Sequence, residues 1–288
     1  MTIVGDAGIE RVEEHQLAVP FAVLSEDPEF VARRVAPLPS GFLDQEAMTF
    51  QFCCQSWLIR VDGLTVLVDP CTGNARKRGV PFFDDLDTPY LQRLADAHAP
   101  RQDIDIVFNT HMHYDHCGWN TMEVDGKWTP TFPNATYLFV EAEYRRWDTA
   151  AGRPAHPNDF NPSVFDECIL PVVQAGQAHI VEAPHTISPS LRIEPAPGHT
   201  EGHCLLQLAS AGARAYFVGD VLHHPAQICR PELHMPGCDD LATAIATRTK
   251  LFERIHDESA LLFPAHFSAP HFGRIGRDDG EYVFEPGP

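Results

Sequence analysis

Basic residues are scarce in this chain of 288 residues. Lys and Arg number 21 against 40 Asp and Glu, which gives a formal net charge of −19. Nucleic acids bind through positively charged surfaces that neutralise phosphates, and a strongly acidic surface repels them. Two bound divalent ions would offset only a small part of this charge. We therefore expect no nucleic-acid partner, and a nuclease activity is disfavoured.

Long apolar segments are missing as well. Residues 1–19 include acidic residues and no apolar stretch as long as the core of a signal peptide. Elsewhere no apolar run approaches the roughly 20 residues that cross a membrane as a helix. We therefore expect neither export nor membrane insertion, and we expect a cytoplasmic protein.

None of the eight cysteines stands in a C-x-x-C pair, the spacing typical of thiolate zinc ribbons and redox-active disulfides. In a cytoplasmic chain we expect them to be mostly reduced core residues. Cys53 and Cys54 are neighbours in a predicted strand, where their side chains would point to opposite faces. A disulfide between them is therefore disfavoured.

Metal-binding side chains are concentrated in one short stretch, where His111, His113, Asp115 and His116 fall within six residues. The stretch follows residues 104–108, a predicted buried strand, so it emerges at a strand end, where ligand sites usually lie. Two residues apart in extended backbone, His111 and His113 share a face and could bind one ion, while Asp115 and His116 suit a second. The alternative is a histidine-rich surface loop, since the chain has 16 His.

Three further candidates follow other predicted strands: His199 in a Gly-His-Thr turn, Asp220 after residues 215–218, and His266 after residues 261–263. Asp69 ends an earlier strand. Together with the first stretch, this order of motifs resembles that of the metallo-β-lactamase superfamily, over roughly residues 49–275. Each motif alone would be a weak signal, whereas the five-part pattern is specific.

The resemblance implies a dinuclear metal site. In it, His111, His113 and His199 would bind the first ion, Asp115, His116 and His266 the second, and Asp220 both. Asp69 would orient a ligand histidine without binding metal. We expect two divalent ions per chain, zinc by default because the ligands are borderline to hard, with iron, manganese or cobalt as replacements. His203 we place in the core.

The resemblance also implies an α/β fold, the four-layer αβ/βα sandwich, and the alternation of predicted strands and helices in two halves agrees with it. We expect one hydrolase domain over residues 48–288, because its ligands must meet at one place. Residues 1–47 are expected to be an N-terminal extension packed on the domain. By the resemblance, this extension could instead cover the metal site or support a homodimer.

Local signals predict several elements of this fold. Residues 49–61 and 64–69 form the strongest hairpin signal, joined by an Asp-Gly turn. Residues 84–97 and 241–256 have apolar side chains at helical spacing, and the first of these helices would be capped by an aspartate. Residues 152–162 are predicted to be a loop, and the basic residues 76–78 are interpreted as solvated.

Paired ions of this kind lower the pKa of a bridging water enough to supply hydroxide near neutral pH, and they polarise a carbonyl. Asp115 could accept a proton as the substrate bond breaks. The zinc β-lactamases usually carry cysteine where this chain has Asp220, and the flavin-linked di-iron branch has glutamate at the place of His113. Antibiotic hydrolysis and dioxygen chemistry are therefore both disfavoured.

Three residues after the bridging aspartate, the homoserine-lactone lactonases have a tyrosine, and this chain has His223. We expect His223 to donate to the developing oxyanion, with packing under the sheet edge as the alternative. Since residue 224 is also histidine, the division of roles between the two stays open.

The predicted function is a zinc-dependent hydrolase that cleaves a carboxylic ester or lactone of a small molecule, with Asp115, Asp220 and His223 as catalytic residues. A phosphotriesterase-like hydrolase is the alternative, ahead of a thioester hydrolase or a non-catalytic metal-binding scaffold. The acidic surface favours an uncharged or weakly anionic substrate. Four apolar residues are expected to line the mouth of the site: Phe21, Leu24, Trp119 and Phe272.

Overall fold

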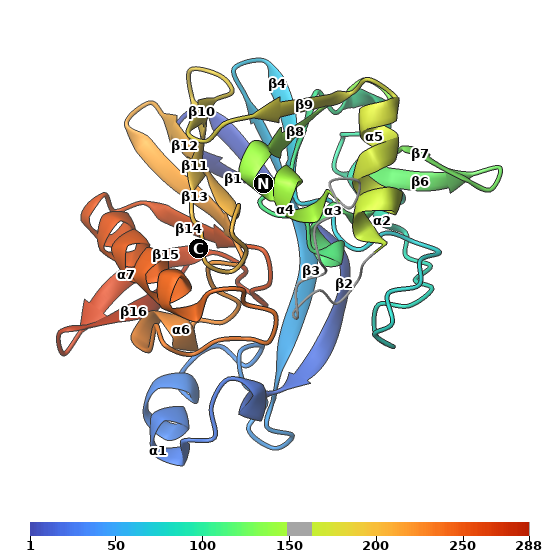
Figure 1. The fold of residues 1–288 in the computed structure, drawn as a ribbon. Helices are drawn as coiled ribbons and strands as arrows, with labels where there is room; N and C mark the ends of the chain where they lie inside the picture. The colour runs from blue at the N-terminus through green and yellow to red at the C-terminus, as the bar shows by residue number, and fades with distance from the viewer. Residues whose placement is uncertain (149–162, 288) are drawn as a thin grey trace.

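In a computed structural model of the chain, which describes residues 1–148 and 163–287, the strands form two large sheets (Figure 1). The first sheet contains, in spatial order, β1 (Thr2–Val4), β2 (Ala7–Pro20), β3 (Thr49–Val61), β4 (Leu64–Val68), β5 (Ile106–Phe108), β8 (Thr136–Val140) and β9 (Ala178–Val181). The second contains β10 (His185–Thr186), β11 (Leu191–Pro195), β12 (Cys204–Ser210), β13 (Ala213–Gly219), β14 (Leu261–Pro264), β15 (Gly273–Asp278) and β16 (Glu281–Pro286). A separate hairpin pairs β6 (Thr121–Val124) with β7 (Lys127–Pro130).

The helices are α1 (Pro28–Phe30), α2 (Tyr90–Asp96), α3 (Tyr114–Cys117), α4 (Glu141–Trp147), α5 (Leu170–Gln174), α6 (Ala226–Cys229) and α7 (Leu241–Asp257). Of these, α2, α4 and α5 contribute to the core outside the first sheet, α6 and α7 to the core outside the second, and α1 packs in a separate cluster. Short 3₁₀ or π turns occur at η1 (Phe21–Val23), η2 (Val31–Val35), η3 (Arg101–Asp103), η4 (Gly118–Asn120) and η6 (Phe165–Ile169). Within the described residues, each helix is too short or too polar to serve as a membrane span.

The alternation of side chains along the strands produces the layers. Trp57 on β3 packs against Phe263 on β14, with ring centroids 4.9 Å apart, in a core between the two sheets. The next residue, Leu58, faces the opposite way, into a core with Leu94 of α2. On the second sheet, Leu262 packs in the core that includes α7. The predicted four-layer αβ/βα sandwich is confirmed.

Two strands at the N-terminus belong to the first sheet, which the sequence did not predict. β2 pairs antiparallel with β3 from Gly8 opposite Arg60 to Pro20 opposite Thr49. Its buried and exposed positions alternate imperfectly because the register shifts between Glu13 and His15. Beyond Pro20 the chain packs its apolar side chains against β3 in a separate core cluster.

The hairpin of β3 and β4 forms as predicted. Asp62 and Gly63 both have positive φ values, 54° and 76°, as a type I′ turn requires. The helix predicted over residues 84–97 is shorter, because it begins only after Pro89 and has no side-chain cap. Instead of capping it, Asp84 accepts hydrogen bonds from the backbone N–H groups of residues 78 and 79.

Of the basic residues 76–78, all of which were expected to be solvated, Lys77 is exposed, but the two arginines are buried. Arg76 and Arg78 are each 1% exposed, and both contact Glu167. Arg76 also donates to Thr121 O at 2.6 Å and lies 3.9 Å over the ring of Trp128. These contacts come from segments far along the chain, so a run of basic letters could not reveal them. The loop predicted over residues 152–162 lies outside the described residues.

Candidate metal centre

The predicted metal ligands meet at the carboxyl ends of strands from both sheets. β4, β5 and β8 are parallel neighbours, as are β13 and β14, so the loops that follow them open at the same end of the sandwich. Two groups of side chains there have ligand atoms within 4.8 Å of one another, and they share Asp220. The first contains His111, His113, His199 and Asp220; the second contains His116, Asp220 and His266; and Asp115 forms a third group with His266 and Cys54.

The second group presents lone pairs without hydrogens between them. Nδ1 of His116 donates to Oδ2 of Asp69 at 3.0 Å, and Nδ1 of His266 donates to the carbonyl of Cys53 at 2.8 Å. In the neutral rings, both Nε2 atoms are therefore acceptors, yet they lie only 3.1 Å apart. Oδ1 of Asp220 lies 3.2 Å from one and 2.9 Å from the other. Three converging acceptors need a cation, so these residues fit a metal ion.

The first group has the same property. Nδ1 of His111 donates to the hydroxyl of Thr110 at 3.1 Å, because that hydroxyl uses its own hydrogen in a bond to a carboxylate at 2.8 Å. Nε2 of His111 is therefore an acceptor and lies 3.0 Å from Nδ1 of His113, which is also 3.0 Å from Nε2 of His199. Oδ2 of Asp220 lies 3.2 Å from the His199 nitrogen. One carboxylate thus offers one oxygen to each group, the geometry needed to bridge two ions.

The charges in the cluster also suit cations. Burial holds the pKa of His111 and of His113 well below the usual value, so both rings are neutral, as ligands must be. Burial opposes a charge on His116 too, but Asp220, followed by two other carboxylates, holds its pKa well above the usual value. Burial would raise the pKa of Asp220, yet the surrounding histidines hold it well below the usual range. The same carboxylates would favour a metal ion in place of that proton, and the ring of His116 would bind the ion in its neutral form.

Asp69 lies behind the candidate ligands and contacts one of them directly. Oδ1 accepts the Thr110 N–H at 2.7 Å, and Oδ2 accepts both the Thr110 hydroxyl and Nδ1 of His116. The side chain is 3% exposed and does not belong to either ligand group. It therefore fixes which nitrogen of His116 carries the hydrogen.

Glu143 is a supporting residue that the sequence analysis missed. It accepts hydrogen bonds from Met112 N–H (2.9 Å), Trp147 Nε1–H (2.7 Å) and the Thr200 hydroxyl (2.7 Å). It thus ties the loop after β5 to the loop that carries His199. A glutamate in the first turn of a short helix is a common surface pattern, so the sequence held no signal that would single it out.

His203 lies in the core, as expected. Its Nε2 accepts the backbone N–H of Asp220 at 3.1 Å, and it belongs to neither ligand group. It therefore supports the bridging residue from behind.

His223, and not His224, faces the site. Burial lowers the pKa of His223 to about 4, so the ring is neutral, and its Nε2 lies 3.1 Å from Oδ2 of Asp220. His224 instead donates to Phe42 O at 2.7 Å. The backbone N–H groups of both histidines donate to Oε1 of Gln227, at 2.6 and 3.0 Å. To donate to a substrate oxygen, His223 would have to release its hydrogen bond to Asp220.

A pocket of about 570 Å³ opens onto both ligand groups. Its floor is formed by His113, Asp115, His199, Asp220 and His223. Its walls are mainly apolar and come from Leu17, Ala18, Val19, Pro20, Val23, Phe52, Val80, Phe82, Phe83, Tyr114, Met235 and Pro236. The N-terminal segment therefore forms one wall of the site.

The four residues expected at the mouth do not line this pocket. Phe21 is fully buried and packs edge-on against His224, and Trp119 donates to a carboxylate oxygen of Glu14 at 2.6 Å. Leu24 and Phe272 are buried in core clusters. The apolar character of the pocket mouth was predicted correctly, but the residues named for it were wrong. The wall residues at the end of β2 were missed because β2 was not recognised as a strand.

A family comparison and structural comparisons agree with this geometry. A profile of the metallo-β-lactamase superfamily matches residues 52–266. The chain belongs to this superfamily. A search of curated proteins finds no match for it.

Several solved structures share the metallo-β-lactamase fold of the chain. Hydrolase AbOPH of the β-lactamase superfamily aligns with a TM-score of 0.79 at 21% identity, over 100% of this chain and 99% of the other. AidC, a dizinc quorum-quenching lactonase, aligns with a TM-score of 0.77 at 20% identity, over 100% of this chain and 96% of the other. A probable metal-dependent hydrolase from Staphylococcus aureus aligns with a TM-score of 0.78 at 18% identity, over 100% of both chains. At these identities, the likeness shows a common fold.

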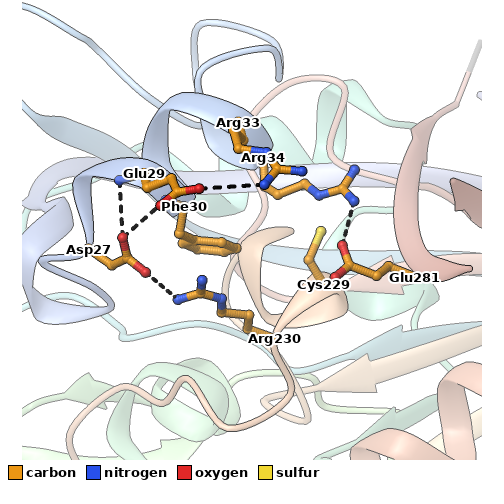
Figure 2. A pocket seen from close by; sticks show the side chains of 8 residues that line it. All are labelled: Asp27, Glu29, Phe30, Arg33, Arg34, Cys229, Arg230 and Glu281. Carbon is orange, nitrogen blue, oxygen red and sulfur yellow. Dashed lines mark hydrogen bonds and ion pairs between the residues drawn. The ribbon is translucent and has the colours of Figure 1, made fainter. Parts of the chain in front are cut away.

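A smaller pocket of about 190 Å³ lies away from the candidate metal centre, beside α1 and the end of α6 (Figure 2). Its charged side chains contact one another: Arg230 lies 2.9 Å from Asp27, and Arg34 lies 2.5 Å from Glu281. Arg230 also stacks at 4.0 Å over the ring of Phe30. Since the arginines drawn in Figure 2 each have a carboxylate partner, we assign no ligand to this pocket.

Proposed function

We propose that the chain is a zinc-dependent hydrolase with two metal ions, and that it cleaves a carboxylic ester or lactone of a small molecule. The observation that carries this proposal is the pair of acceptor clusters that share Asp220 at the floor of an apolar pocket. Divalent ions held there would supply Lewis acidity and lower the pKa of a water molecule to near neutrality. A reaction of this kind requires no protein nucleophile.

The roles of the side chains follow from their positions. Asp220 would hold both ions, since each of its oxygens faces a different group. Asp115 lines the pocket, with its carboxylate oxygens 3.8 Å from Nε2 of His116 and of His266, and would bind the second ion and accept a proton from the reacting water. The neutral ring of His223 would either donate to the substrate carbonyl oxygen or hold Asp220 in place.

The pocket walls set the substrate class. Aliphatic and aromatic side chains surround the acidic floor, and the chain carries a net charge of −19. A polyanion would be repelled, whereas an apolar acyl or alkyl group would gain about 25 cal/mol per Å² that it buries. An uncharged or weakly anionic ester or lactone is therefore the substrate we propose. Because one structural neighbour, AidC, is a lactonase solved with an N-acyl-homoserine product, N-acyl-homoserine lactones are suitable first compounds.

Metal analysis and a hydrolysis screen test the proposal. Protein purified without chelator is expected to contain close to two metal ions per chain, and zinc-loaded protein to hydrolyse at least one lactone or aryl ester. The screen should include phosphotriesters and thioesters. Faster turnover of a phosphotriester than of every ester and lactone would replace our substrate assignment, and active protein with almost no metal would refute the whole proposal.

A further inference from the structure

A cysteine stands beside the second group of ligands. Sγ of Cys54, a carboxylate oxygen of Asp115 and a ring nitrogen of His266 all lie within 4.8 Å of one another. Oδ2 of Asp115 and Nε2 of His266 are 3.8 Å apart. Around one zinc ion, with Zn–S of about 2.3 Å and Zn–N or Zn–O of about 2.0–2.2 Å, donor atoms lie roughly 3.3–4.4 Å from one another. Small movements would therefore bring all three atoms to one ion.

The strand geometry directs Cys54 toward this ion. Side chains two apart on a strand share a face, so Cys54 lies on the same side of β3 as Phe52, whose ring stacks on that of His266 at 3.9 Å. The intervening Cys53 joins the two segments through its backbone: its carbonyl accepts Nδ1–H of His266, and its N–H donates to the His266 carbonyl at 3.2 Å. The position of the sulfur relative to His266 is thus fixed by main-chain hydrogen bonds.

Cys54 packs in an apolar core cluster with Phe50 and Phe52, but this packing gives its thiol no polar partner in the described part of the chain. It is fully buried, and among the described residues it has no hydrogen-bond partner. Two other buried cysteines nearby do have one: Cys71 contacts the Ser56 hydroxyl at 3.3 Å, and Cys117 donates to His113 O at 3.2 Å. A buried donor without an acceptor, placed among metal-binding atoms, points to a metal ion as its partner.

We propose that Cys54 is a further ligand of the second ion and binds it through Sγ. On binding, the S–H bond is lost, a metal–sulfur bond forms, and one proton passes to solvent. This inference rests on the metal centre of the proposed function. A thiolate is a soft ligand that favours zinc over manganese or magnesium, so Cys54 would make the second site selective for zinc.

Cobalt substitution provides a test that does not depend on activity. Protein loaded with two Co²⁺ ions per chain should show the near-ultraviolet charge-transfer absorption of a cobalt–thiolate bond, at the intensity of one such bond. The band should disappear in Cys54→Ser and persist in Cys53→Ser, a matched change on the same strand whose side chain faces the other way. Zinc should also compete less effectively against manganese in Cys54→Ser than in the unmodified protein.

The unmodified protein alone can decide the question, even if Cys54→Ser fails to fold. Two bound Co²⁺ ions without the thiolate band would overturn this inference and leave the dinuclear hydrolase intact. A band that persists in folded Cys54→Ser would also overturn it. Failure to bind two ions would instead refute the proposed function itself.

Discussion

Removing the charge of Asp69 should weaken the second proposed metal site more than the first. In Asp69→Asn, Oδ1 can still accept the Thr110 N–H, but an NH₂ group replaces the oxygen that accepts Nδ1–H of His116. Two donors would then face each other, so His116 must move its hydrogen to Nε2. That nitrogen is the one that faces His266 and Asp220, where the metal ion needs a lone pair.

The size of the effect follows from this change of tautomer. Loss of a carboxylate that orients a ligand histidine typically weakens metal binding ~10–100-fold, which corresponds to about 1.4–2.8 kcal/mol. The larger loss should fall on the second ion, because Asp69 contacts His116 directly but reaches His111 of the first group only through the Thr110 hydroxyl. Metal titration against a competing chelator should therefore resolve one strongly weakened site and one that is less affected.

Asp105→Asn is a suitable control for this experiment. Asp105 also accepts a backbone N–H, from Thr65 at 2.8 Å, but it is exposed and away from the site. Both ions should stay as tightly bound in this variant as in the unmodified protein. If Asp69→Asn also bound both ions with unchanged affinity, or lost both equally, the assignment of Asp69 to His116 would be refuted.

Three further predictions concern neighbouring residues. Asp220→Ala should lose both ions and all activity. His203→Ala should keep both ions in elemental analysis but lose about 1–3 kcal/mol of unfolding free energy, because the Asp220 N–H is left unpaired. Similar metal loss in the two variants would contradict the ligand set. His223→Phe should lower kcat ~10²–10³-fold on the best substrate with both ions retained, if the ring donates in the transition state, and an unchanged kcat would assign it to packing. Burial raises the pKa of Glu14, so over a range of pH the folded protein keeps a proton that the unfolded chain has lost. The free energy of unfolding should therefore fall as the pH rises from about 4.3, the pKa of glutamate in the unfolded chain, through the raised pKa of the folded state. Urea unfolding across this pH range should show a smaller decline in Glu14→Gln, and an identical slope would mean that the carboxyl titrates normally when folded.

The sequence pointed to the candidate metal centre because the proposed ligands stand in short, local patterns at strand ends. His111 and His113 are close in the chain, and Asp220 and His266 each follow a recognisable apolar strand. In the structure these side chains lie close together. A local pattern could not show that Nδ1 of His266 is held by the carbonyl of Cys53, or that the Met112 N–H is held by the carboxylate of Glu143, because these partners come from distant segments.

The part of the pocket wall that lies on β2 was not predicted from the sequence, for a different physical reason. β2 carries acidic, basic and polar side chains on its half-exposed face, and its register shifts midway, so it lacks the clear alternation of a predicted strand. β2 is stabilised by hydrogen bonds to β3, and no stretch of the β2 sequence indicates this partner. The buried Arg76 and Arg78 escaped recognition for the same reason, since Glu167 lies 91 and 89 residues away.

The contact between Cys53 and His266 joins a strand of the first sheet to the last ligand in the chain, 213 residues later. During synthesis, the first sheet leaves the ribosome long before this histidine is made. The second ion site therefore cannot be completed on the nascent chain until nearly the whole protein has emerged. In the proposed centre, loading of the second ion would therefore be a late event, and a protein truncated before residue 266 would lack one of the proposed ligands of that ion.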